Sequence, residues 1–511
     1  MRKVTKILLK LLSLTLLFLI FCPIVLTLVL SLPSVQNYVV DRATEFVSEK
    51  LQTRVEIGRI RIGALGSLRV DDFYVEDYQQ DTLLYAGRVK VFLTGVPEKS
   101  GVTLRNGIMS DVQLNLRETP SGEINIKQVV DKLKKDNPDS LRKPFALMVK
   151  DVRVDDVSVL IERLEHRNPE YGVDYNNMHI KHISALVDNF YFDDGVVGGY
   201  IRNLSAIERS GFMVQNFTGR FAVDKGLIDL QDFEIMARNS DVRLRSLKIK
   251  GEDWLTYKDF IHNVTIEGEL YRTAISTNDI AYFAPHLRHW DLAFRDANVY
   301  VKGTVADMMV DAKNITFGDR STLDCEVNLR GLPNVKSAGM SVDLQKLSTN
   351  EKDMNMLLSG ITGRYLPEKV LSIANSAGEI MLAGSFSGGM SAFNTDMNLI
   401  TEAGSAQLIA QFEHLPSKKI VDDQGVERLS AASSIIEADA NLHTVDLGRL
   451  LGASSLGNVT GQLHFGGVKS KSGIRGQVRG EVGQLNFNDC DYSDLWIAGT
   501  IDNKSFAGEV K

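Results

Sequence analysis

The sequence predicts a mainly β protein: an elongated, repeating β-groove in which a curved single long sheet encloses a hydrophobic interior, with short interspersed helices and one N-terminal transmembrane helix. Three observations predict this fold. An uncharged stretch lies near the N-terminus, a glycine-centred pentapeptide returns along the chain, and helical patterns are too scarce to cover a sheet of this size.

The composition excludes several classes of protein. At 511 residues, with 44% hydrophobic and 24% charged residues, the chain resembles globular proteins. Its net charge of -7 is not that of a nucleic-acid-binding protein, so no nucleic-acid partner is expected. Cys22, Cys325 and Cys490 are too few and too scattered for a disulfide framework or a zinc cluster.

The N-terminus predicts a membrane anchor. Residues 1–10 carry four basic side chains, and residues 11–32 are uncharged and long enough to cross a bilayer as a helix. The positive-inside rule places the basic segment in the cytoplasm and everything after the anchor on the far side of the membrane. A cleaved signal peptide is the alternative, but its apolar stretch usually has about 7–15 residues.

Residues 33–132 are expected to form an N-terminal helix followed by the first β unit. The hydrophobic period changes from helical, over 35–51, to alternating, from Val55 onward. A second helical pattern covers 123–135, and residues 133–144 are interpreted as a linker.

Residues 145–511 are expected to form repeating β-groove units that continue beyond the end of the chain. The pentapeptide apolar, any, Gly, any, apolar places its glycine on the apolar face of a strand, where glycine usually marks a bend, a bulge or a close backbone approach. It is centred on Gly87, Gly199, Gly219, Gly268, Gly303, Gly384, Gly461, Gly480, Gly499 and Gly508.

The same region contains a long, imperfect repeat. Residues 299–334 align with 380–417, and each segment has the pattern of four strands. Repeated units of this kind stack on one another. Between the groups of strands, short capped helices are expected at 276–287, 348–360 and 443–452.

The glycine-bearing face is the predicted binding surface. It carries no charge in three of the repeats, which suits hydrocarbon chains. A row of separate β-sandwiches is the alternative, and there the same face would be a sealed core. The expected lining of the groove is Val301, Gly303, Val305, Leu382, Gly384, Phe386, Gly461, Leu463 and Phe465.

No catalytic, cofactor-binding or metal-binding residue is expected, and the protein is interpreted as a non-enzyme. The chain lacks the nucleotide-binding, hydrolase and zinc-protease motifs. His286, His289 and Asp291 are interpreted as structural, and His179 and His182 should point to opposite faces of one strand. The acidic pairs at 71–72, 155–156 and 193–194 are interpreted as turn residues at strand ends.

Three segments carry a family resemblance: "LPSVQNYVVDRATEFVSEKLQTRVEIGRIRI", "LRVDDFYVEDYQQDTLLYAGRVKV" and "LSAIERSGFMVQNFTGRF". Together with the apolar anchor they resemble the start of TamB-type proteins of the AsmA-like superfamily, in the form found in Bacteroidota. The resemblance covers residues 7–250 well. It implies an inner-membrane-anchored periplasmic β-groove that is linked to outer-membrane protein assembly and to lipid transport between the membranes.

The resemblance also limits what is expected of this chain. The family's C-terminal module, which engages the outer membrane and its barrel partner, should lie several hundred residues further on. We therefore interpret the chain as an N-terminal portion. Contact with outer-membrane barrel assembly proteins is expected only through a part that lies beyond residue 511.

Two non-enzymatic functions remain open. In the first, phospholipid or another acyl-chain lipid lies along the apolar floor while its head group stays in water. In the second, the protein is an assembly factor or tether whose open sheet edges accept strands of client proteins. The uncharged glycine-bearing face favours the first, and a charge at Leu382 should therefore block lipid binding, whereas one at Ser385 should not.

The topology is testable with an engineered cysteine at Ser100. Because the basic segment precedes the uncharged span, this cysteine should lie in the periplasm and react with a membrane-impermeant reagent in intact cells. Labelling only after cell lysis would contradict the assignment.

Overall fold

The structure is a computed structural model, and 24 of its strands are assigned to one sheet that is not closed. The prediction of a mainly β protein built on one long sheet is therefore confirmed, and the alternative of separate sandwiches is wrong. The described residues are 28–29, 32–63, 66–94, 101–129, 146–164, 169–253, 255–334, 337–389, 391–417, 419–421, 427–429, 431–488, 490–503 and 505–511. Two compact units divide the chain: Met1–Asp241 with Asp279–His286, and Val242–Asn278 with Leu287–Lys511.

Some sequence expectations fall outside these residues. The basic segment 1–10 and the linker 133–144 are not described, and neither is most of the expected anchor at 11–32. Among the described residues, no helix is both long enough and apolar enough to span a bilayer.

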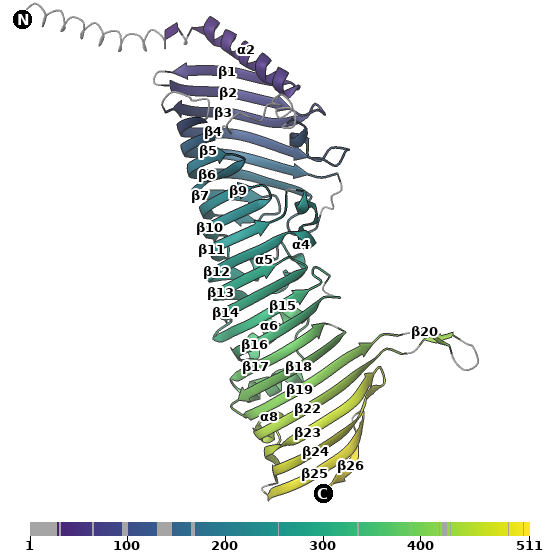
Figure 1. Cartoon of the computed structure of the whole chain (residues 1–511). Helices are drawn as coiled ribbons and strands as arrows, with labels where there is room; N and C mark the ends of the chain where they lie inside the picture. Colours follow the sequence, from purple (N-terminus) through teal and green to yellow (C-terminus); the bar gives the residue numbers. More distant parts are fainter. Residues whose placement is uncertain are drawn as a thin grey trace, which may run out of the picture. The chain divides into compact units, whose positions relative to one another are not determined.

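The first unit begins with helix α2 (Pro33–Leu51), which confirms the helix expected over 35–51. Pro33 occupies its first turn, where a missing N–H costs nothing, and Gln52 ends it in a left-handed conformation. Val47 and Leu51 pack against a buried cluster that includes Val55. The strands of this unit (Figure 1) are β1 (Val55–Gly63), β2 (Ser67–Glu76), β3 (Thr82–Leu93), β4 (Gly101–Arg117), β5 (Ala146–Glu162), β6 (Asn177–Asp193), β7 (Val196–Glu208), β8 (Met213–Val214), β9 (Asn216–Asp224) and β10 (Leu227–Met236).

One strand pair of the first unit is parallel. β4 and β5 run in the same direction, whereas the neighbouring pairs from β1 to β4 and from β5 to β10 are antiparallel. A parallel pair needs a crossover, which lies between Arg117 and Ala146 and includes helical residues 125–129. The fully buried Asn125 anchors this crossover, because its Nδ2 donates to Asp77 Oδ2 at 2.8 Å.

In the second unit, from β13 (Ala293–Gly303) onward, groups of four strands of the main sheet alternate with helices. Helices α6 (Glu351–Thr362) and α8 (Leu447–Leu451) confirm two of the three expected helical segments. The third is confirmed by α5 (Thr277–Ile280) and η3 (Pro285–Leu287). The short helices η2 (Thr256–Asp259) and α4 (Phe260–Asn263), and α7 (Glu368–Ala377), were not expected. The strands are β11 (Asp241–Lys250), β12 (Thr265–Ser276), β13 (Ala293–Gly303), β14 (Asp307–Phe317), β15 (Ser321–Arg330), β16 (Gly339–Thr349), β17 (Ile380–Gly389), β18 (Ala392–Thr401), β19 (Gly404–Leu415), β22 (Ser433–Asp446), β23 (Leu456–Ser470), β24 (Gly473–Phe487), β25 (Cys490–Asp502) and β26 (Ser505–Val510), with the separate hairpin β20 (Lys419–Val421) and β21 (Glu427–Leu429).

Residues with a left-handed backbone conformation (positive φ) interrupt the strands and bend them. Asp72, Asp111 and Asp156 have φ of 56°, 57° and 53° in the middle of β2, β4 and β5. The interpretation of pairs 71–72 and 155–156 as strand ends was therefore wrong, whereas Asp194, with φ of 46°, does lie in a turn. Aspartate tolerates this conformation because its short side chain bonds locally, and such residues bend a strand.

Gly87 departs from the predicted pattern for the same reason. It lies opposite Asp111, and a Cβ at Gly87 would come within 2.9 Å of the Asp111 Cβ. Gly87 thus makes room for the bend of the neighbouring strand, and it does not belong to the apolar face.

The glycine at position 384 can be tested for its role in the sheet. Gly384 has φ of 151°, and a Cβ there would collide with the carbonyl oxygen of Asp396 on the neighbouring strand. We expect Gly384→Ala to destabilise the second unit by about 1–3 kcal/mol, seen as a lower thermal midpoint.

Gly466→Ala is the matched control. Gly466 lies in a strand of the same unit without positive φ, and its nearest contact for a Cβ is the His464 Nε2 at 3.7 Å. Its substitution should leave the midpoint unchanged or raise it slightly. Equal midpoints for the two variants would show that Gly384 is not needed for strand pairing.

Candidate functional site

The register of the second unit brings the predicted lining residues onto one face. Residues that lie directly opposite in paired strands project to the same side of a sheet. One row crosses the strands through Val301, Val310, Val327, Val342, Phe386, Thr395, Ala410, Ala438, Phe465, Val478 and Gly499. The next row runs through Val299, Ala312, Cys325, Leu344, Gly384, Met397, Leu408, Ala440, Leu463, Gly480 and Ile497.

These two rows and the rows beside them are called the apolar face here. The first two contain no charged residue, and Thr395 is their one polar member. A third row continues from Gly303 through Met308, Leu329, Met340, Gly388, Phe393, Phe412, Ile436, Gly467, Gly476 and Ile501. A fourth runs through Leu323, Leu347, Leu382, Leu399, Ala406, Leu442, Gly461, Val482 and Leu495.

Eight of the nine predicted lining residues therefore share one face. Val305 does not, because β13 ends at Gly303 and the chain turns, with Thr304 donating its backbone N–H to the Asp307 carbonyl at 2.9 Å. The sequence pattern treated Val305 as a strand residue, and this placement was wrong. The hairpin that ends the strand depends on pairing with β14, which the pentapeptide does not encode.

Much of the apolar face is partly exposed among the described residues, whereas Ala312 and Cys325 of its second row and Leu347 and Val482 of its fourth row are buried. Leu408 is 44% exposed and Met340 38%, and most of their neighbours in the rows are half-buried. Phe393 stacks between Phe386 and Phe412, with ring centroids 5.3 Å and 5.1 Å apart. An uncovered apolar surface of this extent usually marks a binding site.

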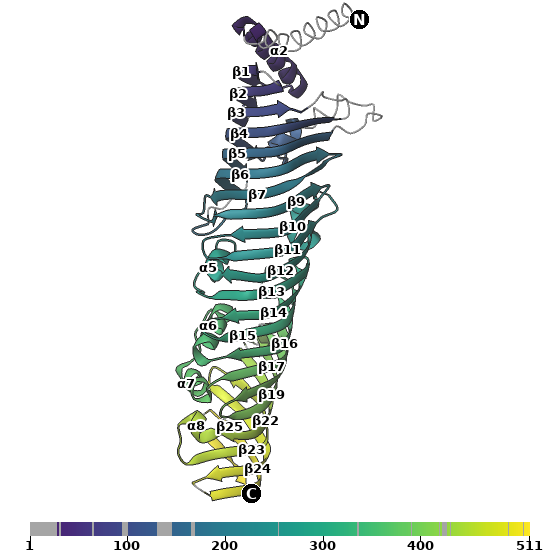
Figure 2. The same ribbon diagram turned by 90° about the vertical axis from the view of Figure 1, so that its left-hand side faces the viewer.

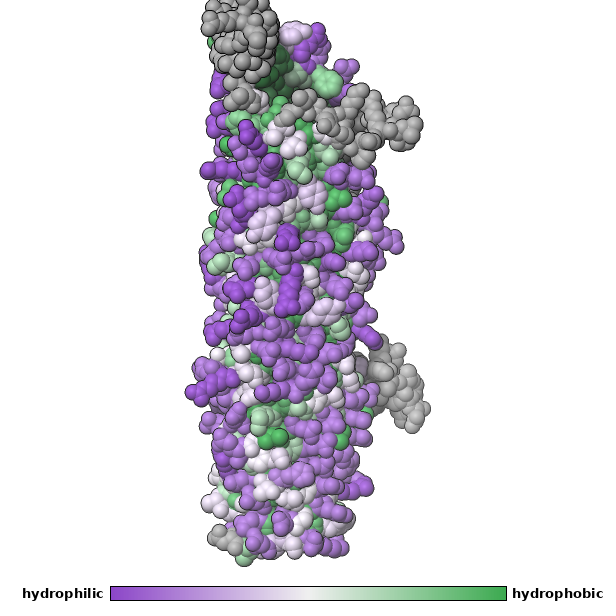
Figure 3. All heavy atoms as spheres, turned by 60° about the vertical axis from the view of Figure 1, so that its left-hand side comes forward, coloured by the Kyte–Doolittle hydropathy of each residue, from purple (hydrophilic) through white to green (hydrophobic). Residues whose placement is uncertain are grey.

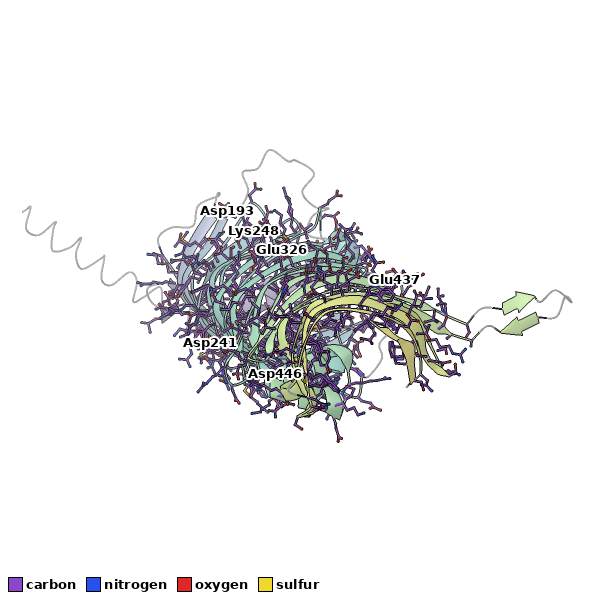
Figure 4. All side chains as sticks on the ribbon, turned by 90° about the horizontal axis from the view of Figure 1, so that it is seen from below. Asp193, Asp241, Lys248, Glu326, Glu437 and Asp446 are labelled. Carbon is purple, nitrogen blue, oxygen red and sulfur yellow. The ribbon has the colours of Figure 1, made fainter. Side chains whose placement is uncertain are left out.

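The opposite face is polar. A row next to the apolar ones, but on the other side of the sheet, runs through Tyr300, Asp311, Glu326, Asp343, Ser385 and Asp396. In Figure 4 the strands of the second unit arch, and Glu326 and Glu437 lie on the convex side. Hydrophilic side chains also dominate the surface that Figure 3 presents. The sheet therefore separates an apolar concave side from a charged convex side.

Helices α6, α7 and α8 cover one margin of the apolar face and lie along one side of the strands (Figure 2). Leu357 of α6 packs with Leu347, and Ala374 of α7 packs near Leu382. Leu382 belongs to both of these clusters. It therefore supports helix packing and is not equivalent to Phe386, which lies on the uncovered part of the face.

Polar contacts fix these helices in place. Asp353 of α6 is fully buried and accepts hydrogen bonds from the Asp319 backbone N–H at 3.0 Å and the Ser321 hydroxyl at 2.8 Å. Arg449 of α8 pairs with Glu402 at 2.7 Å, and this hydrogen bond lowers the pKa of the Glu402 carboxyl. One margin of the apolar face is thus closed by anchored helices.

In the first unit, two glycines of the pentapeptide also lie on the apolar side of their strands. Gly199 pairs with Phe221, which pairs with Leu230. Gly219 makes room for the ring of Phe233, because a Cβ there would lie 2.6 Å from it. These two glycines lie on the apolar face of their strands, as the pentapeptide predicts.

Some of the histidines and acidic residues singled out from the sequence have structural partners. His182, at a bend with φ of 52°, pairs through Nδ1 with Asp156 at 2.9 Å, and Asp291 accepts from Asn278. Burial lowers the pKa of His179. In the part of the chain that the structure describes, no three His, Cys, Asp or Glu side chains are grouped to hold a metal ion.

Comparison of the chain with protein families, with curated proteins and with solved structures finds no match. The class of the protein therefore follows from its own fold and surface. It is a mainly β protein with an open sheet, and its second unit exposes a continuous apolar face.

The reactivity of Cys325 tests the environment of this face. Cys325 lies in its second row, and burial raises the pKa of its thiol to about 11, with Asp324 and Asp311 adding to the shift. Only about one thiol in a thousand is then ionised at pH 8, because the thiolate fraction falls tenfold per pH unit below the pKa. In a chain carrying Cys22→Ser and Cys490→Ser, alkylation by iodoacetamide should be slow at pH 8.

The rate should rise about tenfold per pH unit up to pH 10, because alkylation requires the thiolate. The matched chain that retains only the exposed Cys490 should react faster at pH 8. Equal rates for the two cysteines at pH 8 would contradict the burial of Cys325.

Proposed function

We propose that this protein binds acyl-chain lipids on the apolar face of its second unit and supports their transport toward the outer membrane and outer-membrane biogenesis. It does so without enzymatic chemistry. The observation that carries the proposal is the uninterrupted series of uncharged rows across paired strands, which is buried at Ala312 and Cys325 and partly exposed from β16 to β19.

The geometry of the rows suits an alkyl chain. A chain that lies along a row crosses one strand about every 4.8 Å and meets an uncharged residue at each crossing. Each methylene group removed from water contributes about 0.8 kcal/mol. A charged head group would cost several kcal/mol on this surface and therefore stays in water.

The proposal includes a location that rests on the sequence. The basic segment 1–10 and the uncharged span 11–32 suggest an inner-membrane anchor, with the bulk of the chain in the periplasm. The resemblance to TamB-type proteins points the same way. Lipid would then be received near the anchor, and its movement would follow from the continuity of the apolar rows.

A second candidate is a tether or assembly factor that accepts strands of outer-membrane proteins. Such a protein would accept client strands at an unpaired edge of its sheet by β-augmentation. The second candidate needs this edge and does not need the apolar face. Substitutions on the face therefore distinguish the two functions.

The test compares Phe386→Asp with Ser385→Asp in the full-length protein. Phe386 lies on the uncovered apolar face, and its neighbour Ser385 projects to the polar side. After extraction and exchange into lipid-free detergent, Phe386→Asp should retain less than half of the lipid per protein, because a carboxylate must keep its water. Ser385→Asp should retain the amount found in the unsubstituted protein.

Circular dichroism and thermal unfolding must accompany the lipid measurement. Phe386 is half-buried and stacks on Phe393, so its loss should cost only about 0.5–1.5 kcal/mol of stacking and leave the fold intact. Leu382→Asp is a poorer choice, because it would disturb the helices packed on Leu382. Unchanged lipid content in Phe386→Asp would exclude this face as the lipid path and leave the tether.

A further inference from the structure

Polar side chains of β22 to β25 line a hollow that lies outside the predicted lipid lining except at Gly461, and Leu442, Val482 and Leu495 of the fourth row also border it. Its volume is about 570 Å³, within the range of small-ligand pockets. It lies over β22 to β25, where consecutive cross-strand partners project away from the apolar face. These partners are Asn441, Gln462, Glu481 and Trp496, and the polar lining is completed by His443, Thr460 and Asp494.

Irregular backbone creates this hollow. Thr444 and Asp494 have φ of 50° and 55°, and the pairing of β23 with β24 shifts register between Thr460 and Gly461. Bulges re-aim side chains and are common at binding sites. Gly483 contributes no side chain, so part of the floor is bare backbone.

The charge of the lining excludes anions. Glu481 and Asp494 contribute two carboxylates, and no Lys or Arg is among the described residues that line the hollow. A phosphate or carboxylate ligand would therefore meet like charge. Asn441, Thr460 and Gln462 contribute uncharged hydrogen-bonding groups.

Those groups have unused capacity for hydrogen bonds. Asn441 donates through Nδ2 to the Gln407 Oε1 at 3.2 Å, which leaves its own carbonyl oxygen available. The Gln462 amide has no hydrogen bond to another described residue. Such an amide offers two donors and one acceptor oxygen, a combination that matches neighbouring hydroxyl groups on one ligand.

Trp496 supplies the aromatic part of the lining, beside the aliphatic residues Leu442, Val482 and Leu495. Trp496 is 42% exposed and lies directly opposite Glu481 in the paired strands. An exposed indole face packs well against the C–H groups of a ring that carries hydroxyl groups on its edge. We propose that this hollow binds a neutral saccharide, held by hydrogen bonds to the amides and carboxylates and by contact with Trp496.

An organic ammonium ion is the competing ligand, because indole and carboxylates attract cations. It fits less well. One aromatic ring does not make a cage, and an ammonium ligand would leave the carbonyl and amide groups of Gln462 without matching partners, whereas the Thr460 hydroxyl already accepts from the Thr444 backbone N–H at 3.0 Å. Unpaired polar groups in a site discriminate against a ligand that cannot satisfy them.

The experiment uses the full-length protein in a detergent that carries neither sugar nor choline. An array of neutral glycans identifies ligands, and calorimetry measures their affinity. Gln462→Ala should weaken the binding of the best glycan at least tenfold, and Trp496→Ala should do the same. Asn394→Ala, on the same polar face but outside the hollow, should leave the affinity unchanged.

Three results would overturn the proposal. The first is failure to bind any neutral glycan of the array at millimolar concentration. The second is glycan binding that survives Gln462→Ala in a variant whose circular dichroism is unchanged. The third is binding of choline chloride that is lost in Glu481→Gln, which would assign the hollow to a cation. None of these results depends on the lipid face, because Gln462 projects to the opposite side of the sheet.

Discussion

Bends within the strands are the constraint on which the rest of the structure depends. A bend of this kind needs a residue that tolerates positive φ. Apart from glycine, mainly Asn and Asp do so. Asp72 and Asp111 take this conformation, and Gly87 lies between them in the adjoining strand. Because β4 and β5 place Asp111 and Asp156 at matching positions, the bends line up across the sheet. An aligned series of bends turns a flat sheet into an arched one.

The arch separates two surfaces with different chemistry. Apolar rows face the concave side of the second unit, and the acidic residues Asp311, Glu326 and Asp343 lie in one row on the other side. Like charges directly opposite each other destabilise a sheet, so they are tolerated only where water reaches them. Helices anchored by Asp353 and Arg449 close one margin of the apolar side. An apolar surface that is bordered on one side by anchored helices is suited to bind a flexible alkyl chain.

Glycine has two roles in this architecture that one sequence pattern does not separate. Gly384 and Gly303 lie on the apolar face, where a Cβ would collide with the carbonyl of the partner strand. Gly87 lies opposite a bend and makes room for an aspartate. Both occur in the same apolar, any, Gly, any, apolar context. The partner strand decides which role applies, and that strand can be distant in the sequence.

The sequence by itself determined the properties that depend on neighbours along the chain. The period of two predicted the strands and eight of the nine residues of the apolar face, and the helical period and caps predicted α2, α6 and α8. Tertiary structure decided what depends on pairing: the parallel β4–β5 pair, the end of β13 before Val305, the bends at Asp72 and Asp156, and the position of Leu382 beneath helices. The hollow beside Trp496 also belongs here, because four strands and a register shift create it. Periodicity is local, whereas register is fixed only when two strands meet.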